Sequence, residues 1–269
     1  MNLRIPAYFD QLISGFAAGR VGRHAHLGYW DDPPPLSTPC EPGEFARAQA
    51  RLNDIMISLA RLKDGLTLLD VGCGFGGALE AAAKYANMRL IGVNIDSRQL
   101  QICRTLEKGL NSLELFVADA CALPFPPASF DRVLCIEAMF HFSSRRTFLE
   151  EAARVLRPGG RLVVSDILIH ELLDMASSDV RQIEFALQGE YGPWPRPRER
   201  IEDILIAARD AGLSRKEVMD ATWQTLPSHR ITAPHAGSGL PSGVSAGQTL
   251  RWLHETGRLS YLGMSFTKV

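Results

Sequence analysis

The residues best suited to chemistry are a carboxylate and the glycine-rich turn that follows it. Residues 68–77 read LLDVGCGFGG, and a helix is expected to begin at Ala78. Gly72, Gly74 and Gly77 predict positive φ angles and a backbone that can approach a ligand closely, because no Cβ stands in the way. The same spacing occurs in dinucleotide-binding sites, so the glycines alone do not identify the ligand.

Asp70 lies near the end of the strand candidate, two residues before Gly72, and helps to distinguish a dinucleotide from other ligands. A pyrophosphate is doubly negative and is bound by backbone N–H groups and a helix N-terminus. A carboxylate at the strand tip would repel it but would suit an ammonium group, and S-adenosylmethionine carries one on its amino-acid tail. The sequence therefore favours S-adenosylmethionine, with a turn that is glycine-rich only for packing as the alternative.

Polar residues also follow the second and third strand candidates. Asn94 ends the second about 20 residues after the glycine turn, where a polar side chain can bind ribose hydroxyls, and Gln99 could add a hydrogen bond. Asp96 could join them or cap the next helix. Asp119, after the third strand candidate, could accept a hydrogen bond from the exocyclic amine of adenine or make a turn bond to the backbone.

A histidine follows the fourth strand candidate. His141 is suited to act as general base for an acceptor hydroxyl, because the unperturbed pKa of histidine lies near neutrality. Asp166 ends the fifth strand candidate and could orient the imidazole. The alternative is a structural histidine that bridges two loops.

Apolar stretches that alternate with helical patterns predict βαβ units and a mostly parallel sheet around these residues. Apolar residues at helical spacing predict amphipathic helices over 44–62 and 198–211, and the run Pro158-Gly159-Gly160 is expected to end another helix. The strand candidates are 66–71, 88–94, 113–118, 132–137, 161–167, 215–223 and 260–268.

Three stretches, 1–43, 172–197 and 227–248, do not follow this alternation. They could be plain surface loops, but long loops in an α/β domain are more often lids over a site at the carboxyl edge of the sheet. We therefore expect lid elements. The stretch 227–248 is rich in Gly, Ser, Pro and His and is expected to be mobile.

Composition argues against several classes of protein. The 269-residue chain has 29 basic and 30 acidic residues, so it has no excess of positive charge that would indicate binding to nucleic acid or to an anionic membrane. No apolar run is long enough to span a bilayer, and the first residues lack a signal-peptide core, so a cytoplasmic location is expected. The cysteines form no C-x-x-C pair, and His24 and His26 have no third ligand nearby, so no metal site is expected.

A set of motifs in the right order resembles class I S-adenosylmethionine-dependent methyltransferases. The motifs are LDVGCGFGG at 69–77, ADA at 118–120, LPF with SFD within 123–131, Glu137 with His141, and RVLRPGG at 154–160. The segment HLGYW at 26–30 is similar to the subgroup that contains tocopherol, sterol and rebeccamycin-type sugar methyltransferases. Most family members carry an acid where Asn94 stands, although this subgroup often lacks it.

The resemblance implies a Rossmann-like, doubly wound α/β fold. Its seven-stranded sheet would be mostly parallel, with the last strand antiparallel, and would carry helical lid elements. The whole chain, 1–269, would form one methyltransferase domain. Within it we expect an N-terminal lid at 1–43, a cofactor-binding core at 44–170, and substrate-cap segments at 171–197 and 224–258.

The resemblance also implies S-adenosylmethionine as cofactor and S-adenosylhomocysteine as product. The glycine loop would surround the methionine moiety, and the aromatic faces of Tyr29 and Trp30 could attract the sulfonium from an N-terminal lid, unless they only anchor that segment. The expected cofactor-binding residues are Tyr29, Trp30, Asp70, Gly72, Cys73, Gly74, Asn94, Ile95, Gln99, Asp119, Ala120 and Glu137.

The expected reaction is O- or C-methylation of a small, lipophilic natural product, with His141, Asp166 and Glu137 as catalytic candidates and a homodimer as one option for assembly. Alignment of donor and acceptor can supply much of the acceleration without a base. If an alkene is the acceptor, a carbocation could be stabilised by Glu137, Trp30, Tyr191 or Trp194. The alternatives are a nicotinamide-dependent oxidoreductase and a non-methylating, cyclase-like protein that binds S-adenosylmethionine.

Overall fold

The computed structural model describes residues 5–41, 43–109, 112–172, 175–233 and 245–269. The strands are β1 Thr67–Val71, β2 Arg89–Asn94, β3 Leu113–Val117, β4 Phe130–Ile136, β5 Leu156–Ile169, β6 Leu213–Asp220 and β7 Leu259–Lys268. The helices are α1 Tyr8–Ala17, α2 Glu44–Ala60, α3 Gly77–Tyr85, α4 Ser97–Cys103, α5 Arg145–Val155, α6 Ser177–Tyr191, α7 Ile201–Asp210, α8 Thr222–Thr225, α9 His229–Thr232 and α10 Ala246–Glu255. Short 3₁₀ turns cover Arg104–Gly109, Met139–His141 and Leu226–Ser228.

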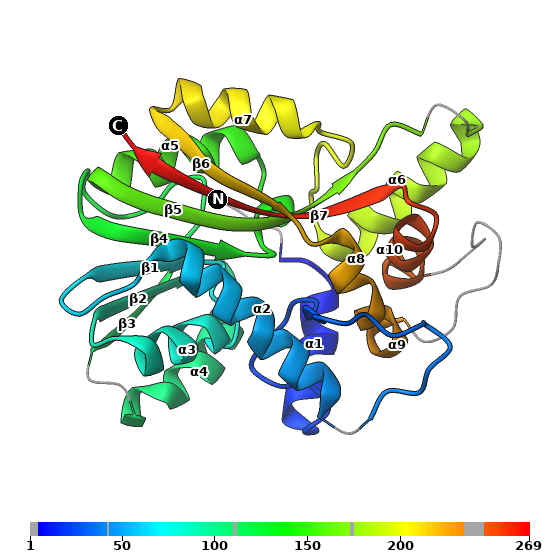
Figure 1. The fold of residues 1–269 in the computed structure, drawn as a ribbon, viewed down its shortest axis with the longest axis horizontal. Coiled ribbons are helices and arrows are strands. Elements are labelled where there is room, and N and C mark those ends of the chain that lie inside the picture. The colour runs from blue at the N-terminus through cyan, green and yellow to red at the C-terminus, as the bar shows by residue number, and fades with distance from the viewer. Residues whose placement is uncertain (1–4, 42, 110–111, 173–174, 234–244) are drawn as a thin grey trace.

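All seven strands join one sheet in the order β3-β2-β1-β4-β5-β7-β6 (Figure 1). Strand β7 runs antiparallel to β5 and β6, and the remaining neighbours are parallel. The predicted seven-stranded sheet with a reversed last strand is therefore confirmed. Its strand order reverses between β1 and β4, which is where open α/β sheets bind ligands.

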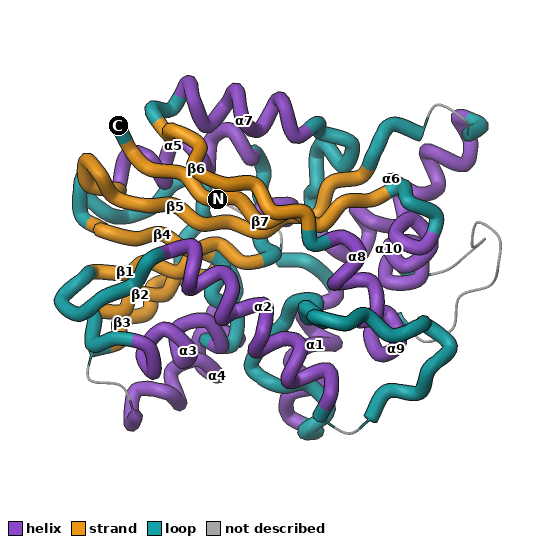
Figure 2. The backbone as a smooth tube through the Cα atoms, viewed as in Figure 1, coloured by secondary structure: helices purple, strands orange, loops and turns teal. Residues whose placement is uncertain are grey.

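Helices cover both faces of the sheet (Figure 2). Leu68 belongs to the same buried cluster as Leu52 of α2 and Leu79 of α3, whereas Leu69 belongs to the cluster that contains Phe148 of α5. Successive strand residues point to opposite faces, and both faces are covered, so apolar residues of the parallel strands are buried on either side of the sheet.

Two strand boundaries differ from the sequence expectation by more than two residues. Strand β5 begins at Leu156, because α5 has already ended at Val155 and Leu156 is extended, with φ −71° and ψ 141°. Pro158 follows closely, and residues before a proline avoid helical geometry. Strand β6 ends at Asp220, ahead of the expected 223, because the Asp220 side chain accepts a hydrogen bond from the Thr222 N–H where α8 begins.

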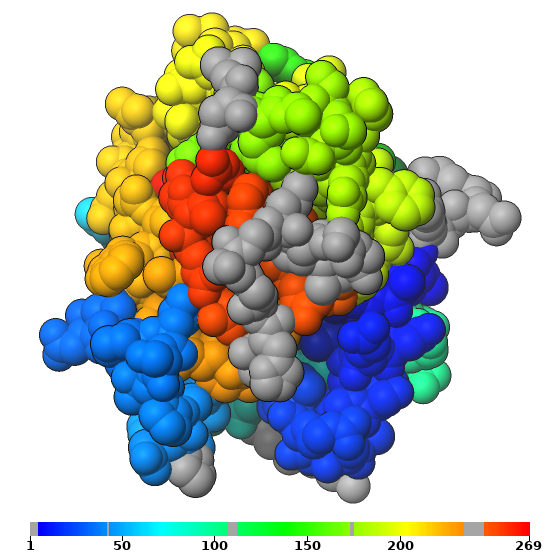
Figure 3. Space-filling view, turned by 90° about the vertical axis from the view of Figure 1, so that its right-hand side faces the viewer, coloured from blue at the N-terminus to red at the C-terminus, as the bar shows by residue number. Residues whose placement is uncertain are grey.

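The stretches expected to form lids contain α1, α6, α9 and the start of α10. Helices α1, α6, α8, α9 and α10 gather at one end of the sheet in Figure 1, and Figure 3 looks on to that end. The expectation of mobility falls mainly on residues 234–244, which lie outside the described residues. The described neighbours of that segment form α9 and α10.

Candidate active site

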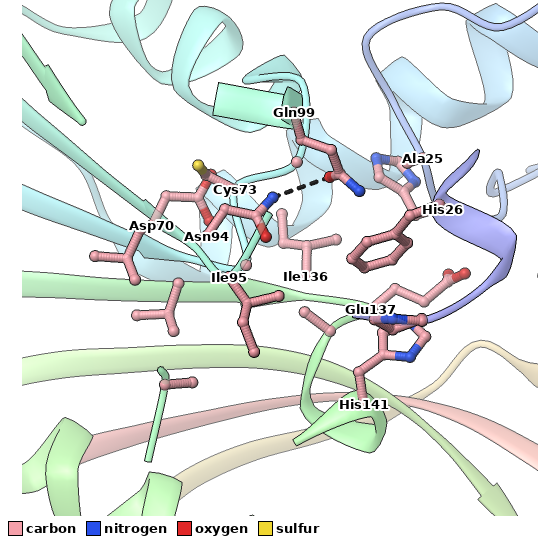
Figure 4. Close-up of a pocket in the computed structure, with 18 of the residues that line it drawn as sticks. Ala25, His26, Asp70, Cys73, Asn94, Ile95, Gln99, Ile136, Glu137 and His141 are labelled. Atoms are coloured by element: carbon pink, nitrogen blue, oxygen red, sulfur yellow. Dashed lines mark hydrogen bonds between the residues drawn. The ribbon is translucent and has the colours of Figure 1, made fainter. Parts of the chain in front are cut away.

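A cavity of about 310 Å³ lies at the carboxyl ends of the central strands (Figure 4). The segments after β1, β2 and β3 line one part of it, and α1 with the turn after β4 lines another. The lining includes every residue expected to bind the cofactor except Tyr29 and Trp30, namely Asp70, Gly72, Cys73, Gly74, Asn94, Ile95, Gln99, Asp119, Ala120 and Glu137, and it also includes His141.

The positive φ angles expected at Gly72, Gly74 and Gly77 are only partly confirmed. Gly72 and Gly74 have φ angles of 77° and 53°, and a third positive φ, 87°, belongs to Gly76 rather than Gly77. Gly77 is needed for a different reason. A Cβ there would lie 2.3 Å from His24 Nδ1, so this glycine lets the N-terminal segment pack directly against the turn.

Asp70 presents a buried carboxylate to the cavity. It is 2% exposed, and its Oδ2 atom has no hydrogen-bond partner among the described residues. Burial raises the pKa of Asp70 to about 7. A buried polar atom without a partner costs about 1–3 kcal/mol, and the ammonium group of S-adenosylmethionine would remove that cost.

Asn94 and Gln99 form a hydrogen-bonded pair at the end of β2. Asn94 Nδ2 donates to Gln99 Oε1 at 2.9 Å, the bond drawn dashed in Figure 4, and the buried Gln99 Nε2 has no partner among the described residues. This free donor fits a ribose hydroxyl. Asp96 instead caps α4, since its side chain accepts from the Arg98 N–H at 2.9 Å. The capping interpretation of Asp96 is therefore confirmed.

Asp119 makes the turn bond that was one of the two roles considered for it. Its Oδ1 accepts a hydrogen bond from the Cys121 N–H at 2.8 Å, which is the turn bond, and the residue also lines the cavity beside Ala120. The turn bond fixes the carboxylate without using its second oxygen.

Sequence reasoning missed His26. Its Nδ1 lies 2.7 Å from the Leu27 carbonyl, which can only accept, so Nδ1 carries the proton and Nε2 is a bare lone pair. That Nε2 is buried without a partner among the described residues, and His26 lines the cavity. Burial lowers the pKa of His26 to about 3, so the ring is neutral. The sequence feature that could have identified His26 is its position at the start of the HLGYW segment, 26–30.

Tyr29 and Trp30 do not line the cavity. Trp30 is 7% exposed, donates from Nε1 to Glu44 at 3.2 Å, and has the Arg230 guanidinium 5.6 Å from its ring centroid. These contacts support the alternative interpretation of Trp30, an anchor for the N-terminal segment.

His141 is held at both ring nitrogens. Nδ1 lies 2.6 Å from the Tyr191 carbonyl and is therefore the protonated nitrogen, so Nε2 accepts the hydrogen bond of the Tyr8 hydroxyl at 2.9 Å. Burial lowers the pKa of His141 to about 4. The imidazole is thus neutral at neutral pH, with its lone pair on Nε2.

The expected His141–Asp166 pair is not formed. Asp166 is fully buried and binds Arg145, whose Nε lies 2.6 Å from Asp166 Oδ2. The backbone carbonyl of Tyr191 orients His141 instead. Asp166 does not line the cavity. The role expected of it, orienting His141, belongs to the Tyr191 backbone carbonyl, which no sequence pattern indicates.

Glu137 reaches the cavity from a strained position. Its φ angle is 50°, a region that side-chain-bearing residues rarely adopt and that clusters at functional sites. Its Oε2 accepts from the Leu27 N–H at 2.9 Å, and burial raises the pKa of Glu137 to about 8. The turn after β4 thus places Glu137 and His141 on the same cavity (Figure 4).

The fold and this cavity define a class I S-adenosylmethionine-dependent methyltransferase, and the chain belongs to that family. Residues 69–164 match the family model described as a methyltransferase domain. The unpartnered buried atoms of Asp70, Gln99 and His26 fit the ammonium and hydroxyl groups of the cofactor. The enzyme uses S-adenosylmethionine to methylate small molecules and yields S-adenosylhomocysteine.

Particular relatives act in the chemistry of small molecules. The chain is 32% identical over 238 residues to methyltransferase GfsG of Streptomyces halstedii, covering 87% of this chain and 81% of that protein. It is 37% identical to the 2-methyl-6-phytyl-1,4-hydroquinone methyltransferase of Synechocystis sp., covering 82% and 69%. A geranyl diphosphate methyltransferase solved with GPP and sinefungin shares the fold, with a TM-score of 0.74 at 22% identity over 96% of this chain and 94% of that one.

Family membership decides against the alternative of a nicotinamide-dependent oxidoreductase. Within the described ranges, no group of three His, Cys, Asp or Glu side chains could hold a metal ion. The described helices include none long and apolar enough to cross a membrane.

Proposed function

We propose that this enzyme methylates a hydroxyl group of an uncharged, lipophilic natural product, with His141 as the group that accepts the hydroxyl proton. The observation that carries the proposal is the orientation of His141. Its Nδ1 is tied to the Tyr191 carbonyl, so the basic Nε2 is the nitrogen that meets Tyr8 at the cavity. When bound, S-adenosylmethionine supplies the methyl group on a positively charged sulfur.

Residues at or just after the carboxyl ends of β1, β2 and β3 hold the cofactor, together with His26. Asp70 binds the ammonium group, and the Gly72–Gly74 turn lies against the methionine moiety. Asn94, Gln99 and His26 bind the ribose hydroxyls, and their free donor and acceptor atoms support this assignment. Asp119, with Ala120 beside it, accepts from the adenine amine.

The remaining walls favour an apolar acceptor. Pro6, Phe9, Leu12 and Phe142 line this part of the cavity. Arg23 is the one arginine or lysine among the described lining residues, and its guanidinium is already bound to the Phe75 and Ile102 carbonyls and the Thr105 hydroxyl, at 3.1, 3.4 and 2.7 Å. A phosphate or diphosphate on the acceptor would find no free cationic partner there.

Tyr8 links the acceptor to His141. Burial raises the pKa of the Tyr8 hydroxyl well above its usual value, so it stays protonated and donates to His141 Nε2. The acceptor hydroxyl donates to the Tyr8 oxygen, and as the acceptor oxygen gains the methyl group its proton passes to Tyr8 while the Tyr8 proton passes to Nε2. The proton then rests on His141 Nε2, and His141 becomes an imidazolium.

C-methylation is the second candidate. Glu137 is a buried carboxyl group on the cavity wall, and a carboxylate there would stabilise a carbocation formed on an alkene acceptor. His141 would then remove a proton from carbon rather than oxygen.

The test is a methyl-transfer screen with labelled S-adenosylmethionine against polyketide, terpenoid, sterol and glycoside acceptors. Each acceptor is offered with a free hydroxyl, with that hydroxyl already methylated, and as its phosphate ester. We expect label in the free-hydroxyl form alone. Label in the methylated form would indicate carbon as the acceptor atom, and a preference for phosphate esters would overturn the apolar-acceptor proposal.

A further inference from the structure

Arg145, at the start of α5, is buried together with Asp166 at the carboxyl end of β5. The exposed fractions of the two side chains are 3% and 0%. Neither residue lines the cavity. We propose that Arg145 is a positioning residue that holds the segment 191–199 against the sheet and, through it, sets the orientation of His141. This inference rests on the proposed function of His141.

One guanidinium joins three parts of the chain. Its Nε donates to Asp166 Oδ2 at 2.6 Å, and its Nη2 donates to the Ile167 carbonyl at 3.2 Å, so both anchor it to β5. Its Nη1 donates to the Arg196 carbonyl at 3.1 Å and lies 3.3 Å from Glu199 Oε2. Arginine presents donors in a fixed planar fork, so it can hold these acceptors in one geometry.

The segment held in this way makes the contacts that fix His141. The Tyr191 carbonyl accepts the His141 Nδ1–H at 2.6 Å, and Pro193 lines the cavity. Trp194 is fully buried and its ring centroid lies 4.6 Å from that of Phe140, the residue before His141. Loss of the Arg145 bonds would therefore free the carbonyl that selects the His141 tautomer.

Stability alone does not require this ion pair. Desolvation of two charges offsets much of their attraction, and buried pairs can often be replaced by apolar residues of similar volume without loss of stability. The double variant Arg145→Met/Asp166→Leu removes both charges at once and avoids a lone buried charge. It separates a packing role, which it preserves, from a directional role, which it removes.

The experiment needs no acceptor. Ring-labelled histidine NMR reads the tautomer and titration of His141, with His141→Ala for assignment, and hydrogen exchange reads the segment 191–199. In the double variant we expect exchange in 191–199 to rise about tenfold or more. We also expect His141 to lose its fixed Nδ1–H tautomer and to titrate closer to the usual 6.5.

Calorimetry should give an S-adenosylhomocysteine affinity within about twofold of wild type, because neither Arg145 nor Asp166 lines the cavity. Arg132→Met is the matched control. Arg132 also donates to a backbone carbonyl, that of Ala60 at 2.6 Å. It lies near the start of β4, whereas His141 follows the end of that strand, so exchange in 191–199 and the His141 signals should stay unchanged.

Wild-type exchange and an unchanged His141 tautomer in a folded double variant would overturn the proposal. If that variant does not fold, Arg145→Lys replaces it, because lysine keeps a charge for Asp166 but cannot also reach Arg196 and Ile167. The same two signals, unchanged in Arg145→Lys, would overturn the proposal equally. Failure of His141 as a base would appear only in turnover and would leave these measurements unaffected.

Discussion

The Tyr8 hydroxyl donates a hydrogen bond to His141 Nε2 at 2.9 Å, and this contact joins the N-terminal helix to the turn after β4. The two residues are 133 positions apart in the chain, and their rings stack with centroids 5.4 Å apart. Residues on α1 therefore complete the site whose opposite wall is built by the sheet.

Removal of the Tyr8 hydroxyl should slow methyl transfer without weakening cofactor binding. In Tyr8→Phe the ring remains but the proton path to His141 is broken, so we expect kcat to fall by about tenfold or more. Labelled-methyl turnover and S-adenosylhomocysteine calorimetry measure the two effects. Tyr85→Phe is the matched control, since Tyr85 is 63% exposed and outside the cavity; equal kcat in Tyr8→Phe and wild type would exclude the relay.

Replacement of His141 by alanine should cost roughly 10²–10⁴-fold in kcat, the usual range for loss of a general base. The pKa of about 4 keeps the ring neutral at neutral pH, so the wild-type rate should lose no His141 contribution until the pH falls toward that value. His170→Ala, at an exposed histidine, serves as the control. Unchanged turnover in His141→Ala would show that the histidine is structural.

Asp70→Asn should weaken S-adenosylhomocysteine binding about 10- to 150-fold, because hydrogen bonds to charged groups contribute about 1.5–3 kcal/mol. Burial raises the pKa of Asp70 to about 7 in the free protein, so wild-type affinity should decrease as the pH falls through that value, and Asp70→Asn should lose this slope. Methylthioadenosine, which lacks the amino-acid tail, should bind both proteins equally. If Asp70→Asn lost more affinity for methylthioadenosine than for S-adenosylhomocysteine, Asp70 would not be the residue that binds the ammonium group.

The contact between Gly77 and His24 should make Gly77→Ala destabilising. The new methyl group would lie 2.3 Å from His24 Nδ1 and 2.9 Å from the Arg23 carbonyl, and such overpacking costs about 1–3 kcal/mol. Gly189→Ala is a contrasting control, because its Cβ meets nothing within 4 Å and alanine favours the helix. Denaturant midpoints measure both, and a neutral Gly77→Ala would mean that the N-terminal segment does not pack on the turn.

The free protein should lose stability between neutral pH and about pH 5. Burial lowers the pKa values of His24, His26, His141, His229 and His254, so the unfolded chain binds more protons at these sites as the pH falls below 6.5, and their contribution to folding is lost. Burial raises the pKa values of Asp70, Glu137 and Asp166, which acts in the opposite direction over the same window. Because the histidines are more numerous, urea unfolding at the two pH values should show a lower midpoint in acid.

Sequence reasoning succeeded where the signal is local. The alternation of strands and helices, and the polar residues at the carboxyl ends of β1 and β2, depend on neighbours in the chain. Asp70, Asn94 and Gln99 accordingly line one cavity. The shift of positive φ from Gly77 to Gly76 is also local, but a run of adjacent glycines does not reveal which one takes that conformation.

The errors concern contacts between distant segments. Asp166 was expected beside His141, but Arg145, which the helix pattern of 145–155 gave no reason to select, occupies its carboxylate. The residue that orients His141 is a backbone carbonyl, and carbonyls carry no sequence signal. In the HLGYW segment the aromatic rings drew attention, whereas His26 lines the cavity and Trp30 lies behind it.

The walls of the cavity come from separate stretches of chain: apart from His26, the proposed cofactor residues lie within 69–164, while α1 and Pro193 lie outside that range. Mutations in these outer stretches can therefore alter which acceptor is accommodated while the methyl donor continues to bind as before. Such a division lets a lineage diversify its products through a few changes in α1 and around Pro193.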